Sequence, residues 1–278
     1  MRETPRSQET AGETGSGPPQ LRPGRALAHT PGASGSGTPH RSDGRPPQTP
    51  RGARHAGQFG RLGATPPALR RPAIFLAAAL LFALLTWQVA AEGALLAYDE
   101  RLGDAIRTSA IPSGPAEFFA DLGNMAVALP VLALTLAYVT WRTRERFAPV
   151  VAVVTMALVP ALVAPLQSLV ARPGPPPMAP ATGFYPSGHA ATAAVAYGLC
   201  VLLSPRSRTP RARELAYGCV LLNAAVGLGL VRQGYHWPVD VVGSWCLSVV
   251  LLCAAAYVIG RGAVSRSRRR SSSGTASC

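Results

Sequence analysis

The sequence has 278 residues, of which 48% are hydrophobic and only 14% are charged, and its formal net charge is +14. All 27 basic residues are arginines, with 11 of them in residues 1–72 and five in residues 261–278. This combination argues against a nucleic-acid binder and is typical of a membrane protein with basic flanks.

Residues 1 to about 70 form a predicted disordered tail. They are mostly Pro, Gly, Ser, Thr and Arg, with hardly an aromatic residue. Such a segment cannot bury enough apolar surface to offset the entropy lost on ordering. The first apolar stretch also comes too late for a signal peptide. The arginines of the tail could attract anionic lipid, although a solvated arm is the simpler interpretation.

Six apolar segments follow within residues 71–260. They lie at about 73–91, 122–138, 147–169, 189–203, 215–231 and 239–260. A helix that crosses a bilayer needs about 17–25 apolar residues, and only the fourth segment is short by that measure. We therefore predict an all-α, polytopic membrane protein with six transmembrane helices in a bundle. The basic residues 261–278 form a predicted C-terminal tail.

The arginines between these segments predict the orientation. They cluster before the first segment, between the second and third, between the fourth and fifth, and after the sixth. With six spans, all four clusters fall on one side, which the positive-inside rule makes cytoplasmic. Both termini of this multi-pass protein of the cell membrane are then cytoplasmic. The connections 92–121, 172–189 and 232–240 fall on the outer face.

The first chemically informative stretch ends in Pro-Ser-Gly-His at residues 186–189, just before a predicted helix of small residues. Ser187 is suited to cap that helix, because its side-chain oxygen can accept a backbone N–H. The free N–H groups at such a helix start can hold an anion such as phosphate. His189 can give or take a proton near neutral pH.

The second informative stretch contains His236 and Asp240, four residues apart. One helical turn brings the carboxylate to an imidazole nitrogen. That contact fixes the tautomer and leaves the other nitrogen free as a nucleophile or base. His189 and His236 are the only histidines after residue 70, and both are predicted at helix ends on the outer face.

An anion site with two histidines and the nearby Arg172 and Arg232 suits phosphoryl transfer without a metal or other cofactor. One histidine attacks phosphorus, and the other protonates the leaving oxygen and later activates water. Arginine and backbone N–H groups stabilise the equatorial oxygens. No cluster of His, Asp and Glu has metal-ligand spacing, and neither a P-loop nor Gly-x-Ser-x-Gly is present.

The motifs at residues 186–189 and 236–240 resemble the second and third signature motifs of the type-2 phosphatidic acid phosphatase superfamily. These are integral membrane lipid phosphate phosphatases, related in their site to vanadium haloperoxidases, and the resemblance covers about residues 73–260. It implies that His236 forms a phosphohistidine, that Asp240 orients it and that His189 is the general acid. It also implies that phosphate oxygens are held by Ser187 and by the backbone N–H of Gly188.

This sequence differs from the first signature motif of the family. It normally has a lysine, six further residues and then Arg-Pro. Counting back from Arg172 puts Pro165 at the lysine position, whereas counting back from Gly174 puts Gln167 there. The lysine is missing either way, and Arg172 is at best the one surviving cation of this motif.

This sequence also differs from the third signature motif of the family. It normally has Ser-Arg, with the arginine six residues before the histidine, and Gly229 and Leu230 occupy those places here. The nearest arginine is Arg232, four residues before His236. We hypothesise that Arg172 and Arg232 replace the missing cations with a rearranged geometry and bind the substrate phosphate.

The sequence therefore predicts a phosphatase that removes phosphate from a lipid phosphate or diphosphate at the outer face of the membrane. Polyprenyl diphosphate, phosphatidic acid and phosphatidylglycerol phosphate are the candidate substrates, and the first is favoured because the site faces outward. The alternative is a non-catalytic descendant that binds or moves a lipid phosphate, which the missing cations support. A phosphotransferase stays open, whereas a haloperoxidase is disfavoured because the relatives with that activity are soluble.

Overall fold

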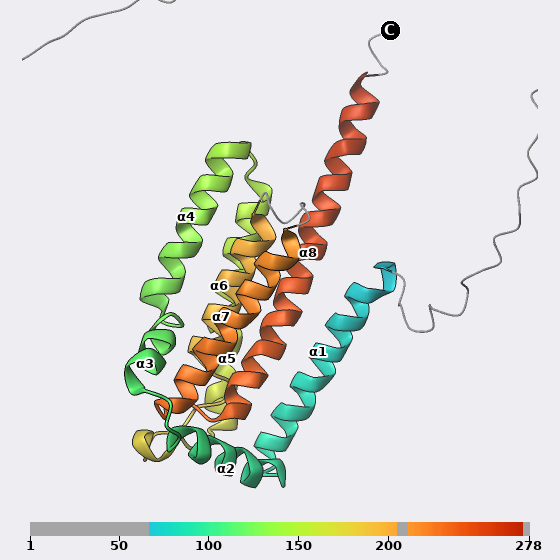
Figure 1. Cartoon of the computed structure of the whole chain (residues 1–278). Helices are drawn as coiled ribbons and strands as arrows, with labels where there is room; N and C mark the ends of the chain where they lie inside the picture. Colours follow the sequence, from blue (N-terminus) through green and yellow to red (C-terminus); the bar gives the residue numbers. More distant parts are fainter. Residues whose placement is uncertain (1–66, 205–210, 275–278) are drawn as a thin grey trace, which may run out of the picture. The chain divides into compact units, whose positions relative to one another are not determined.

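The computed structural model describes residues 67–204 and 211–274, which form α-helices and one short 3-10 helix and contain no β-strand (Figure 1). This part of the chain has the predicted all-α architecture. Nearly all of the predicted disordered tail lies outside the described residues. The first helix begins at Pro67, so the last residues assigned to that tail are helical and the predicted boundary at 70 is slightly late.

Five described helices are long and apolar enough to cross a membrane. They are α1 (Pro67–Ala90), α4 (Met125–Thr143), α5 (Phe147–Val170), α7 (Ala212–Arg232) and α8 (Pro238–Gly274). The sixth apolar helix, α6 (Gly188–Leu203), has 16 residues and is shorter than a typical span. The six helices correspond to the six predicted segments, and the predicted short one is short.

α8 is longer than predicted, because it continues for 37 residues to Gly274 instead of ending at Gly260. The sequence after Pro238 contains no further proline to stop the helix. The predicted C-terminal tail, 261–278, is therefore helical over most of its described length.

Residues 92–121, predicted as a loop, contain the two short helices α2 (Leu95–Arg107) and α3 (Ser113–Asp121). α2 turns one face inward, where Asp99 and Gly103 are buried and Leu95, Leu96 and Ile106 are half-buried. This spacing of three and four residues is that of an amphipathic helix. At 13 and nine residues the two helices are too short to span a membrane, and α2 lies across one end of the bundle (Figure 1).

α6 lies at the centre of the bundle and packs against α4, α5, α7 and α8. Every residue from Ala190 to Tyr197 is buried, and most of them are alanine. Small side chains let helix backbones approach closely inside a membrane. α7 approaches α3 in the same way, since a Cβ at Gly229 would lie 2.4 Å from the carbonyl oxygen of Ala116.

The connections that carry the histidines lie at the same end of the bundle as α2. The turn at 144–146 and the C-terminal part of α8 lie at the opposite end (Figure 1). The predicted convergence of the two histidine-bearing loops is confirmed by the fold.

Candidate active site

The two predicted catalytic histidines lie side by side, with 6.3 Å between their ring centroids. His189 is the second residue of α6 and is exposed, whereas His236 precedes α8 and is buried. Gly234, with φ +74°, lets the chain turn sharply from α7 toward His236. Phe184 packs edge-on against the His236 ring, with 5.7 Å between centroids.

Asp240 lies beside His236, as the four-residue spacing predicts. Its Oδ2 is 3.5 Å from Nδ1 of His236, which is an ion-pair distance and not a hydrogen bond. Nδ1 is buried and makes no hydrogen bond to another residue of the described ranges. The same Oδ2 accepts the backbone N–H of Trp237 at 2.9 Å. With Nδ1 turned toward Asp240, the Nε2 atom of the ring points away from it.

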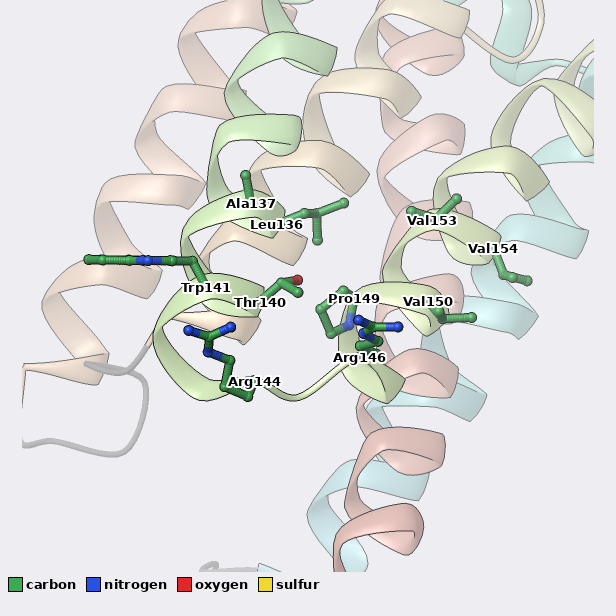
Figure 2. A pocket seen from close by; sticks show the side chains of 10 residues that line it. All are labelled: Leu136, Ala137, Thr140, Trp141, Arg144, Arg146, Pro149, Val150, Val153 and Val154. Carbon is green, nitrogen blue, oxygen red and sulfur yellow. The ribbon is translucent and has the colours of Figure 1, made fainter.

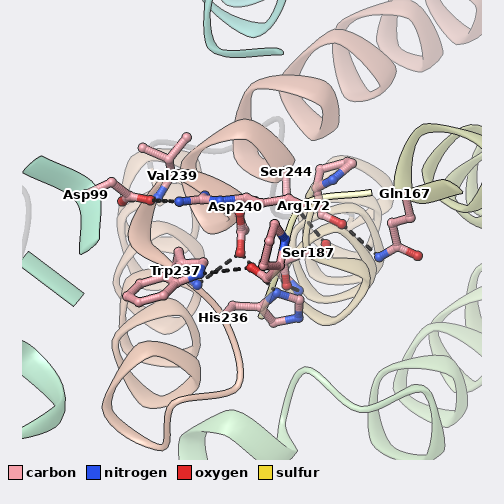
Figure 3. A network of polar contacts seen from close by, with 12 residues as sticks. Asp99, Gln167, Arg172, Ser187, His236, Trp237, Val239, Asp240 and Ser244 are labelled. Carbon is pink, nitrogen blue, oxygen red and sulfur yellow. Dashed lines mark hydrogen bonds and ion pairs between the residues drawn. The ribbon is translucent and has the colours of Figure 1, made fainter. Parts of the chain in front are cut away.

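Arg172 joins Asp240 to a second carboxylate, that of Asp99 on α2 (Figure 3). Its Nη1 donates to Oδ1 of Asp240 at 2.6 Å, and its Nη2 donates to Oδ2 of Asp99 at 2.5 Å. The guanidinium also lies over the Trp237 ring, 5.7 Å from its centroid. Asp99 in turn accepts the backbone N–H of Val239 at 2.8 Å, so this buried ion-pair chain fastens α2 to the start of α8.

The ion-pair chain has two carboxylates for one guanidinium, and all three residues are buried. Burial raises the pKa of Asp99 above its usual 3.8, the adjacent Arg172 opposes this rise, and the Asp240 carboxylate adds to it. A buried charge needs such partners, because removing one of them leaves another charge uncompensated.

Arg172 and Arg232 were predicted to bind the substrate phosphate, but in the structure both contact other groups of the protein. Arg172 is 3% exposed and directs its guanidinium at the two carboxylates. Arg232 donates from Nε to the carbonyl oxygen of Ile111 at 2.9 Å and from Nη1 to that of Arg107 at 2.8 Å. It therefore ties the end of α7 to the connection between α2 and α3.

Ser187 caps α6, as predicted, and is fully buried. Its Oγ accepts the N–H of Ala190 at 3.2 Å, and its own N–H donates to the carbonyl oxygen of Asp240 at 3.1 Å. Ser244 on α8 donates its hydroxyl to the Ser187 carbonyl oxygen at 2.8 Å. The start of α6 is thus fixed to the start of α8. As first residues of the helix, Gly188 and His189 have N–H groups without an intrahelical acceptor.

Both histidines line a cavity of about 750 Å³ that extends between α4 and α5. Gly188 and Phe184 share the polar end of this cavity, and Gln167 lies there too, where it donates to the Pro186 carbonyl oxygen at 2.9 Å. The walls farther along are apolar. They are formed by Met125, Leu129, Leu132, Ala133, Leu136, Val153, Met156, Ala157, Val159, Pro160, Val163 and Ala164.

The cavity lining contains no arginine among the described residues. Within the same ranges, no three His, Cys, Asp or Glu side chains gather as a metal-ligand set. The expected absence of a metal stays a prediction, which a chelator can test.

Asp99 is the residue of this site that the sequence motifs did not reveal. A usable signal exists, because Asp99 shares the inward face of α2 with Leu95, Leu96, Gly103 and Ile106. An acidic residue on the apolar face of an amphipathic helix requires a buried partner. Arg172 is that partner here.

Comparison with known proteins decides the family. Residues 148–262 match the family model described as PAP2 superfamily. This part of the chain belongs to the PAP2 superfamily. The segment contains both histidines and both motifs, so the family resemblance noted in the sequence is confirmed. A search of curated proteins found no match for this chain.

A crystal structure described as the first transmembrane PAP2 type phosphatidylglycerolphosphate phosphatase, from Bacillus subtilis, has a similar fold. The TM-score is 0.59 at 20% sequence identity, and the match covers 68% of this chain and 96% of that one. At this identity the likeness concerns the fold. Together with the family match, it supports the predicted enzyme class: a multi-pass membrane phosphatase of the PAP2 type, that is, a phosphoric monoester hydrolase for lipid phosphates in general.

Proposed function

We propose that this PAP2 protein hydrolyses a lipid phosphate or diphosphate through a phosphohistidine on His236, without a metal. One observation carries the proposal: His189 and His236 line the same cavity, and its remaining lining side chains are apolar except for Gln167, Thr182 and Thr192. Two acid–base groups beside an apolar channel suit a substrate with a phosphate head and a hydrocarbon chain.

In the first step, Nε2 of His236 attacks phosphorus, so that a P–N bond forms and the P–O bond to the lipid breaks. Asp240, 3.5 Å from Nδ1, stabilises the positive charge that the ring gains. His189, at the N-terminal end of α6, donates its proton to the leaving oxygen. The N–H groups of Gly188 and His189 bind the phosphate oxygens at the helix start.

In the second step, His189 has lost its proton and accepts one from a water molecule. The water oxygen attacks phosphorus, the P–N bond breaks, and inorganic phosphate leaves. The exposure of His189 gives water access to this position, whereas His236 is buried beneath Phe184.

We assign Asp99, Arg172 and Ser187 to positioning this site. Arg172 holds Asp240 from one side and Asp99 from the other, so the carboxylate beside His236 cannot rotate freely. Ser187 fixes the α6 helix start against α8. This assignment replaces direct phosphate binding by Arg172 and by the Ser187 hydroxyl, and Arg232 becomes a tether of α7.

The dimensions of the cavity favour polyprenyl diphosphate among the candidate substrates. On α4 its lining runs from Met125 to Leu136, about 18 Å at about 1.5 Å per residue. One leaflet of the hydrocarbon core is about 15 Å thick. A single isoprenoid chain needs only this one channel, whereas a diacyl lipid must also place a second chain.

We assign the site to the outer face of the membrane. The C-terminal end of α4 and the turn to α5 lie at the end of the bundle opposite α2, and the C-terminal part of α8 extends toward that end (Figure 1). Arg142, Arg144 and Arg146 belong to that end of α4 and to the turn, and Arg261 belongs to the C-terminal part of α8. Arginine-rich connections stay in the cytoplasm, which supports the outward orientation of the histidines and cytoplasmic termini.

Phosphate release tests the proposed function. The purified full chain in detergent is offered polyprenyl diphosphate and phosphatidic acid in parallel, with and without EDTA. We expect release that survives EDTA and that is faster with polyprenyl diphosphate. Release that requires an added divalent cation would refute the metal-free mechanism, and a preference for phosphatidic acid would refute the substrate assignment.

The absence of an arginine from the cavity lining favours one alternative, a protein that binds lipid phosphate without hydrolysing it. Retention of radiolabelled lipid phosphate with no release on either substrate would establish that alternative. A phosphotransferase would instead consume the substrate and yield a phosphorylated acceptor in place of inorganic phosphate.

A further inference from the structure

A second cavity lies along the seam, that is, the contact line between α4 and α5, at the end near the turn 144–146 and away from the histidines (Figure 2). Its volume is about 650 Å³. Its apolar walls are formed by Leu136 and Ala137 on α4 and by Pro149, Val150, Val153 and Val154 on α5. Leu136 and Val153 also line the cavity at the histidines, so the two cavities adjoin each other along the seam.

Two arginines close the far end of this second cavity. Arg144 and Arg146 belong to the turn between α4 and α5, both line the cavity, and both are exposed. Neither guanidinium makes a hydrogen bond or ion pair within the described ranges. Glu145 lies between them, and its carboxylate accepts the N–H of Phe147 at 3.1 Å, so it caps α5.

The remaining lining residues suit a membrane interface. Trp141 and Thr140 stand beside the arginines (Figure 2). Tryptophan is enriched where the hydrocarbon core meets the head groups, and a guanidinium binds phosphate oxygens in a bidentate manner. The cavity thus offers positive charge at the head-group level and an apolar channel below it.

We propose that this cavity binds one anionic glycerophospholipid from the leaflet opposite the active site. The phosphodiester contacts Arg144 and Arg146, and one acyl chain enters the channel between Leu136 and Val153. The occupant is a lipid and not free phosphate, because the volume behind the arginines is apolar. The proposal does not depend on the hydrolytic reaction.

Trp141 provides a local readout, since it lines only this cavity. The full chain in detergent is titrated with phosphatidylglycerol that has brominated acyl chains, which quench tryptophan fluorescence on contact. The signal of a Trp141→Phe variant is subtracted, and brominated phosphatidylcholine serves as the neutral lipid. We expect saturable quenching by the anionic lipid at concentrations where the neutral lipid gives little.

Two pairs of variants distinguish specific lipid binding in the cavity from nonspecific attraction of anionic lipid to basic residues. Arg144→Gln with Arg146→Gln should weaken binding about 30-fold, at roughly fivefold per arginine. Arg142→Gln is the matched control, because Arg142 is exposed on the same helix end and does not line the cavity. Ala137→Phe fills the channel without a change of charge and should also abolish the saturable quenching. Leu134→Phe, on the exposed face of α4, should preserve it.

Equal weakening by Arg142→Gln and by the double change of Arg144 and Arg146 to Gln would overturn the proposal, and so would binding that survives Ala137→Phe. Displacement of the brominated lipid by inorganic phosphate alone would also overturn it, since a free anion would then be the ligand. Because the readout is confined to Trp141, a negative result would leave the assignment of the phosphatase site unaffected.

Discussion

The two walls of the active-site cavity are built in opposite ways. Behind the wall formed by the starts of α6 and α8, the polar groups have buried partners, from Asp99 through Arg172 to Asp240. On the wall formed by α4 and α5, the side chains are apolar and the helices leave an open seam. The reacting groups are therefore held rigidly, whereas the surface that meets a lipid chain makes few directional demands.

The largest effect is expected on the polar wall, at the nucleophile itself. His236→Ala should lower the rate of phosphate release by at least about 1,000-fold, because it removes the proposed nucleophile. The rate is measured with saturating lipid. Phe184→Leu is the matched control, since Phe184 contacts the His236 ring without taking part in the chemistry. Release that persists in His236→Ala would move the nucleophile elsewhere.

The next effect concerns the ion-pair chain. Asp99→Asn should lower the free energy of unfolding by about 1–2 kcal/mol, because asparagine has one acceptor oxygen for the two donors of Arg172 and Val239. Thermal unfolding in detergent measures the loss. Asp104→Asn on the same helix is the control, since the exposed pair of Asp104 with Arg107 should contribute less than about 1 kcal/mol.

The pH dependence of stability sharpens this test. Burial raises the pKa of Asp99 in the folded state, so folding favours its neutral form. The stability that Asp99 contributes is then full below about pH 4 and is lost as the pH rises through its folded-state pKa. Asp99→Asn cannot titrate and should lose less stability than the wild type between acidic and neutral pH. An identical loss in both proteins would contradict the raised pKa.

A smaller effect is expected on the apolar wall. Ala133→Phe places a ring in the channel and should raise KM for a long-chain lipid phosphate about tenfold, with kcat nearly unchanged. A water-soluble short-chain phosphate should show no change. Leu134→Phe is the control, because Leu134 is 72% exposed and lies outside the cavity lining. Equal effects of the two substitutions would show that the channel does not hold the chain.

The smallest expected effect tests whether protonated histidine supplies the positive charge that a bound anion meets. Because no arginine lines the cavity among the described residues, a bound anion meets positive charge only from protonated imidazole. Inhibition by sulfate, whose charge is constant, should weaken as the pH rises and His189 loses its proton, by at most about tenfold per pH unit for one imidazole. Inhibition that is independent of pH would mean that a permanent cation, such as a displaced arginine, reaches the site.

The sequence predicted the apolar segments and the proximity of His189, His236 and Asp240 well, because both depend on local patterns. Segment hydrophobicity gives the helices, and the motifs give His189, His236 and Asp240. The partners of the arginines were not predictable in this way. Arg172 and Asp99 are 73 residues apart, and Arg232 reaches carbonyl oxygens more than 100 residues away. Only the packing of α2 across the bundle end brings these groups together.

Covalent labelling tests the central claim most directly. The full chain is mixed with lipid phosphate that has a radioactive phosphoryl group, in the presence of EDTA, and is quenched in alkali, in which phosphohistidine is stable. We predict a labelled protein whose label is lost in acid, maps to His236 and is absent from His236→Ala. Phosphate release without any labelled intermediate, or a label at another residue, would contradict the account.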